Sequence, residues 1–128
     1  MEHTPSQSIK WNRQPEEHFT GKAWMSVLSR ADDRTLNAIS VLFEPGARTH
    51  WHSHPEGQVL YVTSGTGRAG TEVGGIITIT AGDVVYAHPG ELHWHGAAPD
   101  SPMSHLSLTT GGATVWDPRA VTPEEYGG

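Results

Sequence analysis

The sequence of 128 residues contains no cysteine. Disulfide bonds, thiolate metal sites and cysteine nucleophiles are therefore excluded, so that any bound metal must be held by nitrogen and oxygen ligands. Basic residues are also few: eight Lys and Arg stand against 14 Asp and Glu, which gives a formal net charge of −6. Because the basic residues are scattered, this balance argues against a nucleic-acid partner, which requires clustered positive charge.

Long apolar runs are absent as well. No stretch reaches the ~18 consecutive apolar residues of a membrane-spanning helix, and the residues after Met1 do not resemble a secretory leader. We therefore expect no membrane partner and a cytoplasmic location. The length is that of one ordinary domain. We expect a single domain over residues 1–128, in which the polar and aperiodic residues 1–18 form a loosely structured arm.

Turn-forming residues are abundant, with 15 Gly and nine Pro. Short apolar segments lie between turn signals such as Ser64-Gly65 and Gly74-Gly75, which recur about every 8–12 residues. This spacing is typical of a sandwich or barrel, so we predict an all-β jelly roll. The predicted strands are residues 22–28, 36–44, 58–63, 76–80, 83–87, 94–97 and 103–109.

A single helical signal lies near the end of the chain. Thr122, Pro123 and Glu125 form the pattern of a capping box with proline at the first helical position. Gly127 follows, so the helix is predicted to make about one turn.

Histidine is the compositional anomaly, because five of the nine His crowd into two short stretches. In residues 50–54, His50, His52 and His54 are spaced by two, so an extended chain carries all three on one face. Gln58 opens the next strand, and a hairpin can bring its amide oxygen toward His52 and His54. The first stretch therefore predicts a cluster of metal-binding side chains.

The second stretch, residues 91–96, has His93 and His95 on either side of Trp94, so a second strand can supply a further imidazole. Alternating His can also be merely a polar strand face, but two such clusters favour a metal site. His3 and His18 are interpreted as solvated residues of the arm. We interpret the remaining polar candidates, His88 and Glu56, as turn residues.

Two motifs in this sequence resemble those of the cupin superfamily, whose members form a double-stranded β-helix. The first motif, a Gly, His-x-His, a carboxylate and a second Gly, is matched by Gly46, His52, His54, Gln58 and Gly65, with Gln in place of Glu. The second, Gly-Asp, Pro-Gly and His, is matched by Gly82, Asp83, Pro89, Gly90 and His93. Two motifs in the correct order are a much stronger signal than either alone.

A narrower resemblance is to the bacterial manganese-dependent cupin hydroxynitrile lyases. It rests on FTG at 19–21, FEPGART at 43–49, WHSHPEGQ at 51–58, GDVV at 82–85, PGELHWHGAAP at 89–99, MSHL at 103–106 and VTPEEY at 121–126. The resemblance implies that His52, His54, Gln58 and His93 bind the metal. It also implies that His105 is the general base beside it.

The surroundings of this site can be assigned in outline. His50 and His95 are candidates for hydrogen bonding to the second ring nitrogen of the ligands, or for lining the mouth of the pocket. The pocket itself is expected to be lined by Ile39, Val41, Met103 and Thr109. His105 could alternatively be a satisfied histidine of the core, but it shares a strand face with Met103 and Ser107 in an interior already lined with His.

Three imidazoles and a neutral amide leave a divalent ion with its full charge, and therefore a strong Lewis acid. Nitrogen and oxygen ligation favours Mn(II), with Fe(II) next and Zn(II) possible. The expected reaction is reversible cleavage of a cyanohydrin to an aldehyde and HCN. In it the metal lowers the pKa of the substrate hydroxyl and His105 takes the proton.

Two other functions stay open at this stage. An Fe(II)-dependent dioxygenase would use the same nitrogens and would stop without O₂. A non-catalytic cupin that binds a small molecule would have no turnover to lose when His105 is replaced. We also expect a homodimer or homotetramer, because residues 58–63 and 76–80 carry apolar side chains on both strand faces.

Overall fold

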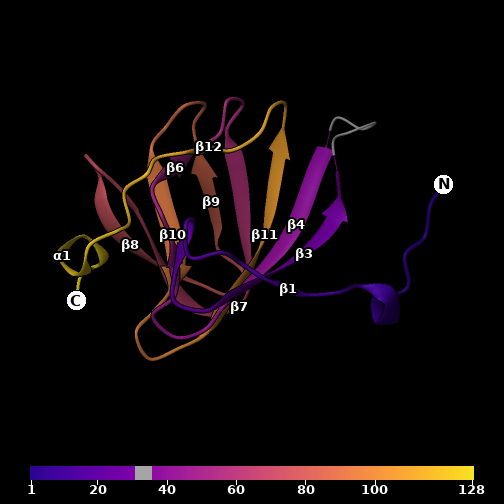
Figure 1. The fold of residues 1–128 in the computed structure, drawn as a ribbon, viewed down its shortest axis with the longest axis horizontal. Helices are drawn as coiled ribbons and strands as arrows, with labels where there is room; N and C mark the ends of the chain where they lie inside the picture. The colour runs from indigo at the N-terminus through magenta and orange to yellow at the C-terminus, as the bar shows by residue number, and fades with distance from the viewer. Residues whose placement is uncertain (31–35) are drawn as a thin grey trace.

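The structure of the protein, a computed structural model, describes residues 1–30 and 36–128 and is built mainly of β-strands (Figure 1). The predicted all-β fold is confirmed, and each of the seven predicted strands is present. The strands are β1 Asn12–Arg13, β2 Phe19–Thr20, β3 Ala23–Ser29, β4 Leu36–Phe43, β5 Arg48–Thr49, β6 His52–Ser53, β7 Gln58–Thr71, β8 Gly75–Thr80, β9 Val84–Ala87, β10 His93–Ala97, β11 Met103–Thr110 and β12 Val115–Trp116.

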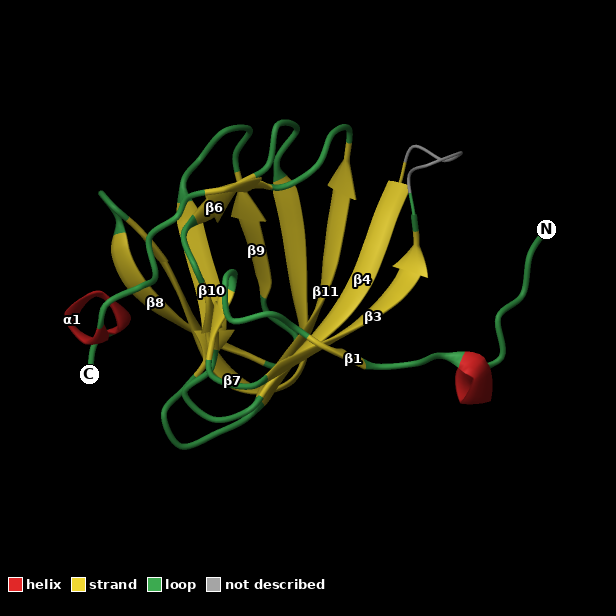
Figure 2. Cartoon of the chain, viewed as in Figure 1, coloured by secondary structure: helices red, strands yellow, loops and turns green. Residues whose placement is uncertain are grey.

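All strand pairs are antiparallel and form two sheets that curl toward each other (Figure 2). The first, sheet A, has the order β1-β3-β4-β11-β7-β9. The second, sheet B, is formed by β8, the second half of β7, β10 and the short strands β5, β6, β2 and β12. The inner faces of the two sheets enclose the main apolar core and a cavity next to it, which the next subsection describes.

Strand β7 belongs to both sheets and departs from the prediction. The sequence places a turn at Ser64-Gly65, but the strand continues to Thr71, so this prediction is wrong. Gly65 has a positive φ of 75°, and a side chain there would collide with the carbonyl of Pro102. The glycine therefore bends the strand instead of reversing it, as at a β-bulge. Residues before it pair with β11 and β9, and residues after it pair with β10 and β8.

The arm of residues 1–18 is almost entirely exposed, and its first residues project away from the barrel (Figure 1). It is not loose throughout, because it contains a 3₁₀-helix at Ser6–Ser8 and the strand β1. The register of β1 against β3 places Asn12 opposite Met25. The reason is that β3 is otherwise an edge strand with free backbone groups, which a passing extended segment can satisfy.

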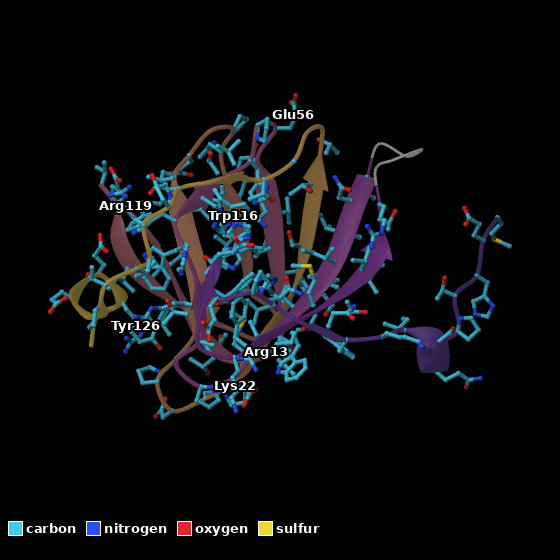
Figure 3. All side chains as sticks on the ribbon, in the orientation of Figure 1. Arg13, Lys22, Glu56, Trp116, Arg119 and Tyr126 are labelled. Atoms are coloured by element: carbon cyan, nitrogen blue, oxygen red, sulfur yellow. The ribbon has the colours of Figure 1, made fainter. Side chains whose placement is uncertain are left out.

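The C-terminal segment covers the outer face of sheet B. Helix α1, Pro123–Tyr126, begins with the predicted capping box, in which the side chains and backbone N–H groups of Thr122 and Glu125 hydrogen-bond reciprocally. Tyr126 packs with Trp51, Trp94 and Val121, and its hydroxyl donates to the Ala97 carbonyl at 2.6 Å. Figure 3 shows Tyr126 and Arg119 on this side of the barrel. No helix in the described part of the chain has the length and apolarity needed to cross a membrane.

Candidate metal and catalytic site

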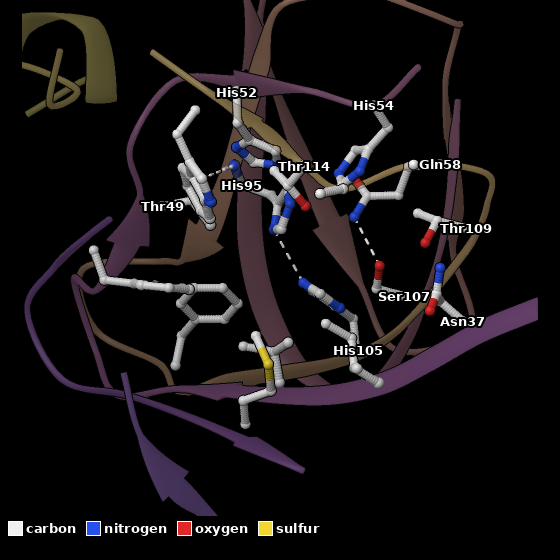
Figure 4. A pocket seen from close by; sticks show the side chains of 18 residues that line it. Asn37, Thr49, His52, His54, Gln58, His95, His105, Ser107, Thr109 and Thr114 are labelled. Atoms are coloured by element: carbon white, nitrogen blue, oxygen red, sulfur yellow. Dashed lines mark hydrogen bonds between the residues drawn. The ribbon is translucent and has the colours of Figure 1, made fainter. Parts of the chain in front are cut away.

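The barrel holds a cavity of about 330 Å³ between the two sheets (Figure 4). One part of its wall is apolar, and the other is polar and contains most of the candidate site residues. The apolar part consists of Phe19, Met25, Ile39, Val41 and Phe43. The polar part includes Asn37, Thr49, His52, His54, Gln58, His95, His105, Ser107, Thr109 and Thr114. Such a division suits a ligand with one apolar end and one polar end.

His52 and His93 face each other across β6 and β10, with ring centroids 4.4 Å apart. Each ring is held by its own backbone. Nδ1 of His52 donates to the His50 carbonyl at 2.9 Å, and Nδ1 of His93 donates to the Glu91 carbonyl at 2.8 Å. A carbonyl can only accept, so both neutral rings carry their proton on Nδ1 and present a lone pair on Nε2. This is the arrangement that orients metal-binding histidines.

Gln58 and His54 complete the polar cluster. The Gln58 amide donates from Nε2 to Ser107 Oγ at 2.7 Å, and its Oε1 lies 2.8 Å from Nε2 of His93. These two atoms face each other with lone pairs, an arrangement that a cation bound to both would satisfy. Nε2 of His54 is buried and has no hydrogen-bond partner within residues 1–30 and 36–128. Nε2 of His93, Oε1 of Gln58 and Nε2 of His54 thus all lack a proton donor within the described residues.

His95 and His105 form a second unit in the cavity wall. Nε2 of His105 and Nδ1 of His95 are joined by a hydrogen bond of 3.0 Å, and both side chains are buried (Figure 4). In the described part of the chain Nε2 of His95 has no hydrogen-bond partner. The ligand atoms of His52, His93 and His95 all lie within 4.8 Å of one another. His95 therefore lies in the tightest imidazole triad rather than behind it, and it connects the metal-binding candidates with His105.

Burial controls the electrostatics of all five histidines. Loss of solvation lowers the pKa of His52, His54, His93, His95 and His105, and neighbouring imidazoles lower several of these pKa values further. The pKa of His54 and that of His105 fall to about 4. The rings are consequently neutral near pH 7, which is the form that binds a metal or accepts a proton.

These shifts predict the pH dependence of stability of the metal-free protein. An unfolded His has a pKa of about 6.5, whereas folded His105 has a pKa of about 4. Between these values the unfolded chain binds more protons, so the free energy of unfolding should fall as the pH drops from about 6.5 toward 4 and stay level above 7. Urea unfolding at pH 7.5, 6 and 5 measures this. His105→Leu should make the dependence less steep, while the four other buried histidines keep part of it. Equal stability of the wild type at pH 7.5 and 5 would contradict the prediction.

The donor set suits a divalent metal ion. It combines neutral imidazoles with preset tautomers, one amide oxygen, two buried nitrogens that have no partner in residues 1–30 and 36–128, and no cysteine sulfur. Such a set matches the first-row ions that accept mixed nitrogen and oxygen ligands. His93 borders a second cavity of about 260 Å³ and does not line the first.

Two predicted pocket residues lie elsewhere. Between the pairs Arg48–Gly96 and His52–His93, the strand that contains β5 and β6 has one residue more than β10. This extra residue reverses the alternation, so the ring of His50 does not line the cavity and only its carbonyl serves the site. Met103 is fully buried in the apolar core, where it packs at Gly67, and does not line the cavity.

Several cavity residues were not found from the sequence. Phe19 and Met25 come from the first strands, and Thr114 and Trp116 come from the segment after β11. Trp116 packs against the ring of His52 and stacks on His18, with ring centroids 4.9 and 4.1 Å apart respectively. His18 is thus half-buried against an aromatic ring rather than solvated. No local pattern could have identified these residues, because only the fold brings them to the cavity.

Comparison with known proteins agrees with this geometry. The family model of the cupin domain matches residues 39–109. The chain belongs to the cupin family. This cupin is 49% identical over 116 residues to an (R)-mandelonitrile lyase of Granulicella tundricola, and the match covers 88% of each chain.

Solved structures resemble the cupin closely. A cupin-like protein from Thermotoga maritima is 40% identical, with a TM-score of 0.85 and 89% of each chain covered. A polyketide cyclase from Streptomyces resistomycificus covers 98% of this chain and 90% of its own, with a TM-score of 0.77. At 16% identity the cyclase shows the fold alone.

Proposed function

We propose that this cupin is a metal-dependent hydroxynitrile lyase that cleaves a cyanohydrin to an aldehyde and HCN, and joins them in the reverse direction. The observation that carries the proposal is the cavity of about 330 Å³, where His52, His54 and Gln58 line the wall next to the hydrogen-bonded pair His95–His105. The similarity to a mandelonitrile lyase supports this reaction class.

The metal would be held by His52, His54, Gln58 and His93. His52 and His93 present oriented lone pairs, while His54 has an unpartnered buried nitrogen and Gln58 directs its oxygen to the same place. Nitrogen and oxygen ligation suits Mn(II), Fe(II) and Zn(II). Of the three ions we favour Mn(II), followed by Fe(II) and then Zn(II). A divalent ion held there supplies Lewis acidity, which lowers the pKa of a hydroxyl bound to it.

The pair His95–His105 is the proposed proton acceptor. Both rings are neutral, and the 3.0 Å hydrogen bond allows a proton taken up by one ring to be stabilised by the other. The substrate O–H proton moves to an imidazole nitrogen of the pair, and the oxygen forms the carbonyl as the C–CN bond breaks. The bonding electrons leave with cyanide, which then receives the same proton to give HCN.

The apolar wall would hold the substituent of the substrate. Phe43, Val41 and Ile39 lie on one inner strand face, and Met25 and Phe19 extend the apolar surface. An aromatic or branched aliphatic group placed there would leave its hydroxyl toward the histidines. The cavity of about 330 Å³ is within the range of small-molecule sites.

A dioxygenase is the second candidate, because the close triad His52, His93 and His95 could also hold Fe(II) with open positions. The two functions differ in their need for oxygen. A binding protein without catalysis is disfavoured, since it has no use for a neutral, buried histidine pair beside the ligand site.

The proposal is tested by anaerobic assay of aldehyde release from mandelonitrile, with protein whose metal content has been measured. Manganese-loaded protein should release aldehyde without O₂, and the same sample stripped with a chelator should not. His88→Ala, a change at an exposed turn outside the cavity, serves as the matched control and should keep full activity. Fully metallated protein that releases no aldehyde would refute the lyase.

A further inference from the structure

The ring of His52, a proposed metal ligand, is held by more than its hydrogen bond. Nδ1 donates to the His50 carbonyl, and the ring also packs against the indole of Trp116, with centroids 4.9 Å apart. In the described part of the chain, every other ring that contacts a proposed ligand imidazole belongs to a histidine of the site itself. Trp116 can therefore orient His52 without competing for the metal, because an indole is a hydrogen-bond donor only.

A hydrogen bond alone does not fix an imidazole. It holds one nitrogen in place, but the ring can still tilt about the line of the bond. A flat aromatic ring packed against the imidazole resists this tilt. Together the two contacts determine where Nε2 of His52 points, and such control of ring orientation is what the groups around a metal-binding histidine supply.

Trp116 is brought to His52 by the C-terminal segment. Strand β12 pairs with β6, and the register places Trp116 opposite His52 (Figure 1). Two further backbone hydrogen bonds extend this pairing, from the Asp117 N–H to the Trp51 carbonyl at 3.0 Å and from the Trp51 N–H to the Arg119 carbonyl at 3.3 Å. The indole is consequently fixed by its backbone as well as by the rings around it.

His18 covers the indole of Trp116. The two rings are stacked, with centroids 4.1 Å apart and an angle of 4° between their planes. Phe19, the next residue, also packs on the indole, at 5.9 Å between centroids. His18 is half-buried and does not line the cavity, so its ring acts on the indole and not on a molecule in the cavity.

A second connection between His18 and His52 runs through the backbone. The His18 carbonyl accepts a hydrogen bond from the His50 N–H at 2.8 Å, and the His50 carbonyl accepts one from Nδ1 of His52 at 2.9 Å. Residue 50 is thus fixed at both its N–H and its carbonyl. Substitutions at His18 remove only the ring contact, because the backbone bond does not depend on the side chain.

We propose that Trp116 and His18 are positioning residues for His52, which set the plane of its ring and thereby the affinity of the site for a divalent metal ion. The inference rests on the proposed ligand set and assigns a role to two residues outside it. The stack joins the end of the N-terminal arm to the C-terminal segment over a ligand. Loss of partners that orient a ligand usually lowers metal affinity ~10–100-fold.

Titration of the metal-stripped protein with Mn(II) alone, followed by isothermal titration calorimetry, tests the proposal. Trp116→Leu should raise the dissociation constant ~10-fold or more, whereas Trp116→Phe keeps a flat ring and should stay within ~3-fold of wild type. His18→Ala should raise the constant by a smaller factor of ~3–10, because the backbone connection through His50 remains. His18→Phe, which restores a stacked ring, should return it to the wild-type value.

Trp24→Leu is the matched control. Trp24 is half-buried like Trp116, but it lies on β3 and does not line the cavity. The variant should bind Mn(II) as the wild type does. Thermal unfolding of the metal-free proteins accompanies the titrations, and Trp116→Phe and His18→Ala provide the test if Trp116→Leu does not fold.

The outcomes separate this inference from the proposed lyase. Folded Trp116→Leu and His18→Ala proteins that bind Mn(II) as tightly as wild type would overturn the inference and leave the lyase in place. An equal loss of affinity in Trp24→Leu would also overturn it, because the effect would then reflect a general loss of packing. A wild type that does not bind Mn(II) would refute the metal site and this inference with it. The expected affinities in a protein that releases no aldehyde would support the inference and refute the lyase.

Discussion

His105→Ala is expected to lower the rate of cyanohydrin cleavage by ~10²–10⁴, the usual contribution of a positioned acid–base group. The ring of His105 is buried and neutral, and its Nε2 is bonded to Nδ1 of His95. Removing it leaves His95 without a partner to stabilise an added proton. The metal content should stay at the wild-type level, because His105 contacts no proposed ligand atom by a hydrogen bond.

His95→Ala should cause a loss of similar size, and the double variant should be little slower than either single one. Residues that act as one unit show this non-additivity, whereas independent contributions would multiply. Steady-state kinetics of the four proteins measure it, with thermal unfolding as the check on folding. Added imidazole should restore part of the activity of His105→Ala by entering the space that the side chain leaves. Activity of His105→Ala within twofold of wild type would exclude the pair as proton acceptor.

Loss of a metal-binding side chain is the second large effect. His52→Ala, His54→Ala and His93→Ala should each lose bound metal and with it nearly all turnover, since each removes one neutral imidazole from the proposed ligand set. Elemental analysis of the purified variants measures the content, and activity is assayed on the same samples. His95→Ala provides the matched comparison: it should keep the metal and lose only the activity.

Gln58→Glu separates metal binding from Lewis acidity at the same position. The carboxylate can accept a hydrogen bond from the Ser107 hydroxyl in place of the amide N–H donated now at 2.7 Å. It should retain the metal, or bind it more tightly, while its negative charge cancels part of the charge of the ion. We expect a slower enzyme with full metal content.

The metal content of the histidine variants also identifies the third imidazole ligand. A His54→Ala protein with full metal content and a His95→Ala protein without metal would assign that position to His95 instead of His54.

The fold class and most of the site followed from local patterns. Alternation with a period of two is a property of the strand backbone, so it located the strands and placed His52 and His54 on one face. The capping box at Thr122 depends on neighbours three residues apart and was equally visible. The expected hairpin does not form, because β6 pairs with β10 and β12 and not with β7. Pairing with β10 instead places His93 opposite His52, and Nε2 of His93 lies 2.8 Å from Oε1 of Gln58.

Other features of the protein depend on the register between distant segments, and only the tertiary structure decided them. Gly65 was a turn signal in the sequence, yet pairing with β11 and β10 makes it a bend within one strand. One additional residue opposite β10 turned His50 away from the cavity.

The hydrogen bond between His95 and His105 crosses from sheet B to sheet A, and Trp116 reaches the cavity from the segment after β11. The sequence by itself determined which side chains alternate along each strand and which residues can bind a metal. The packing of the two sheets determined which of those side chains meet, because contacts between strands depend on pairings that no local pattern encodes.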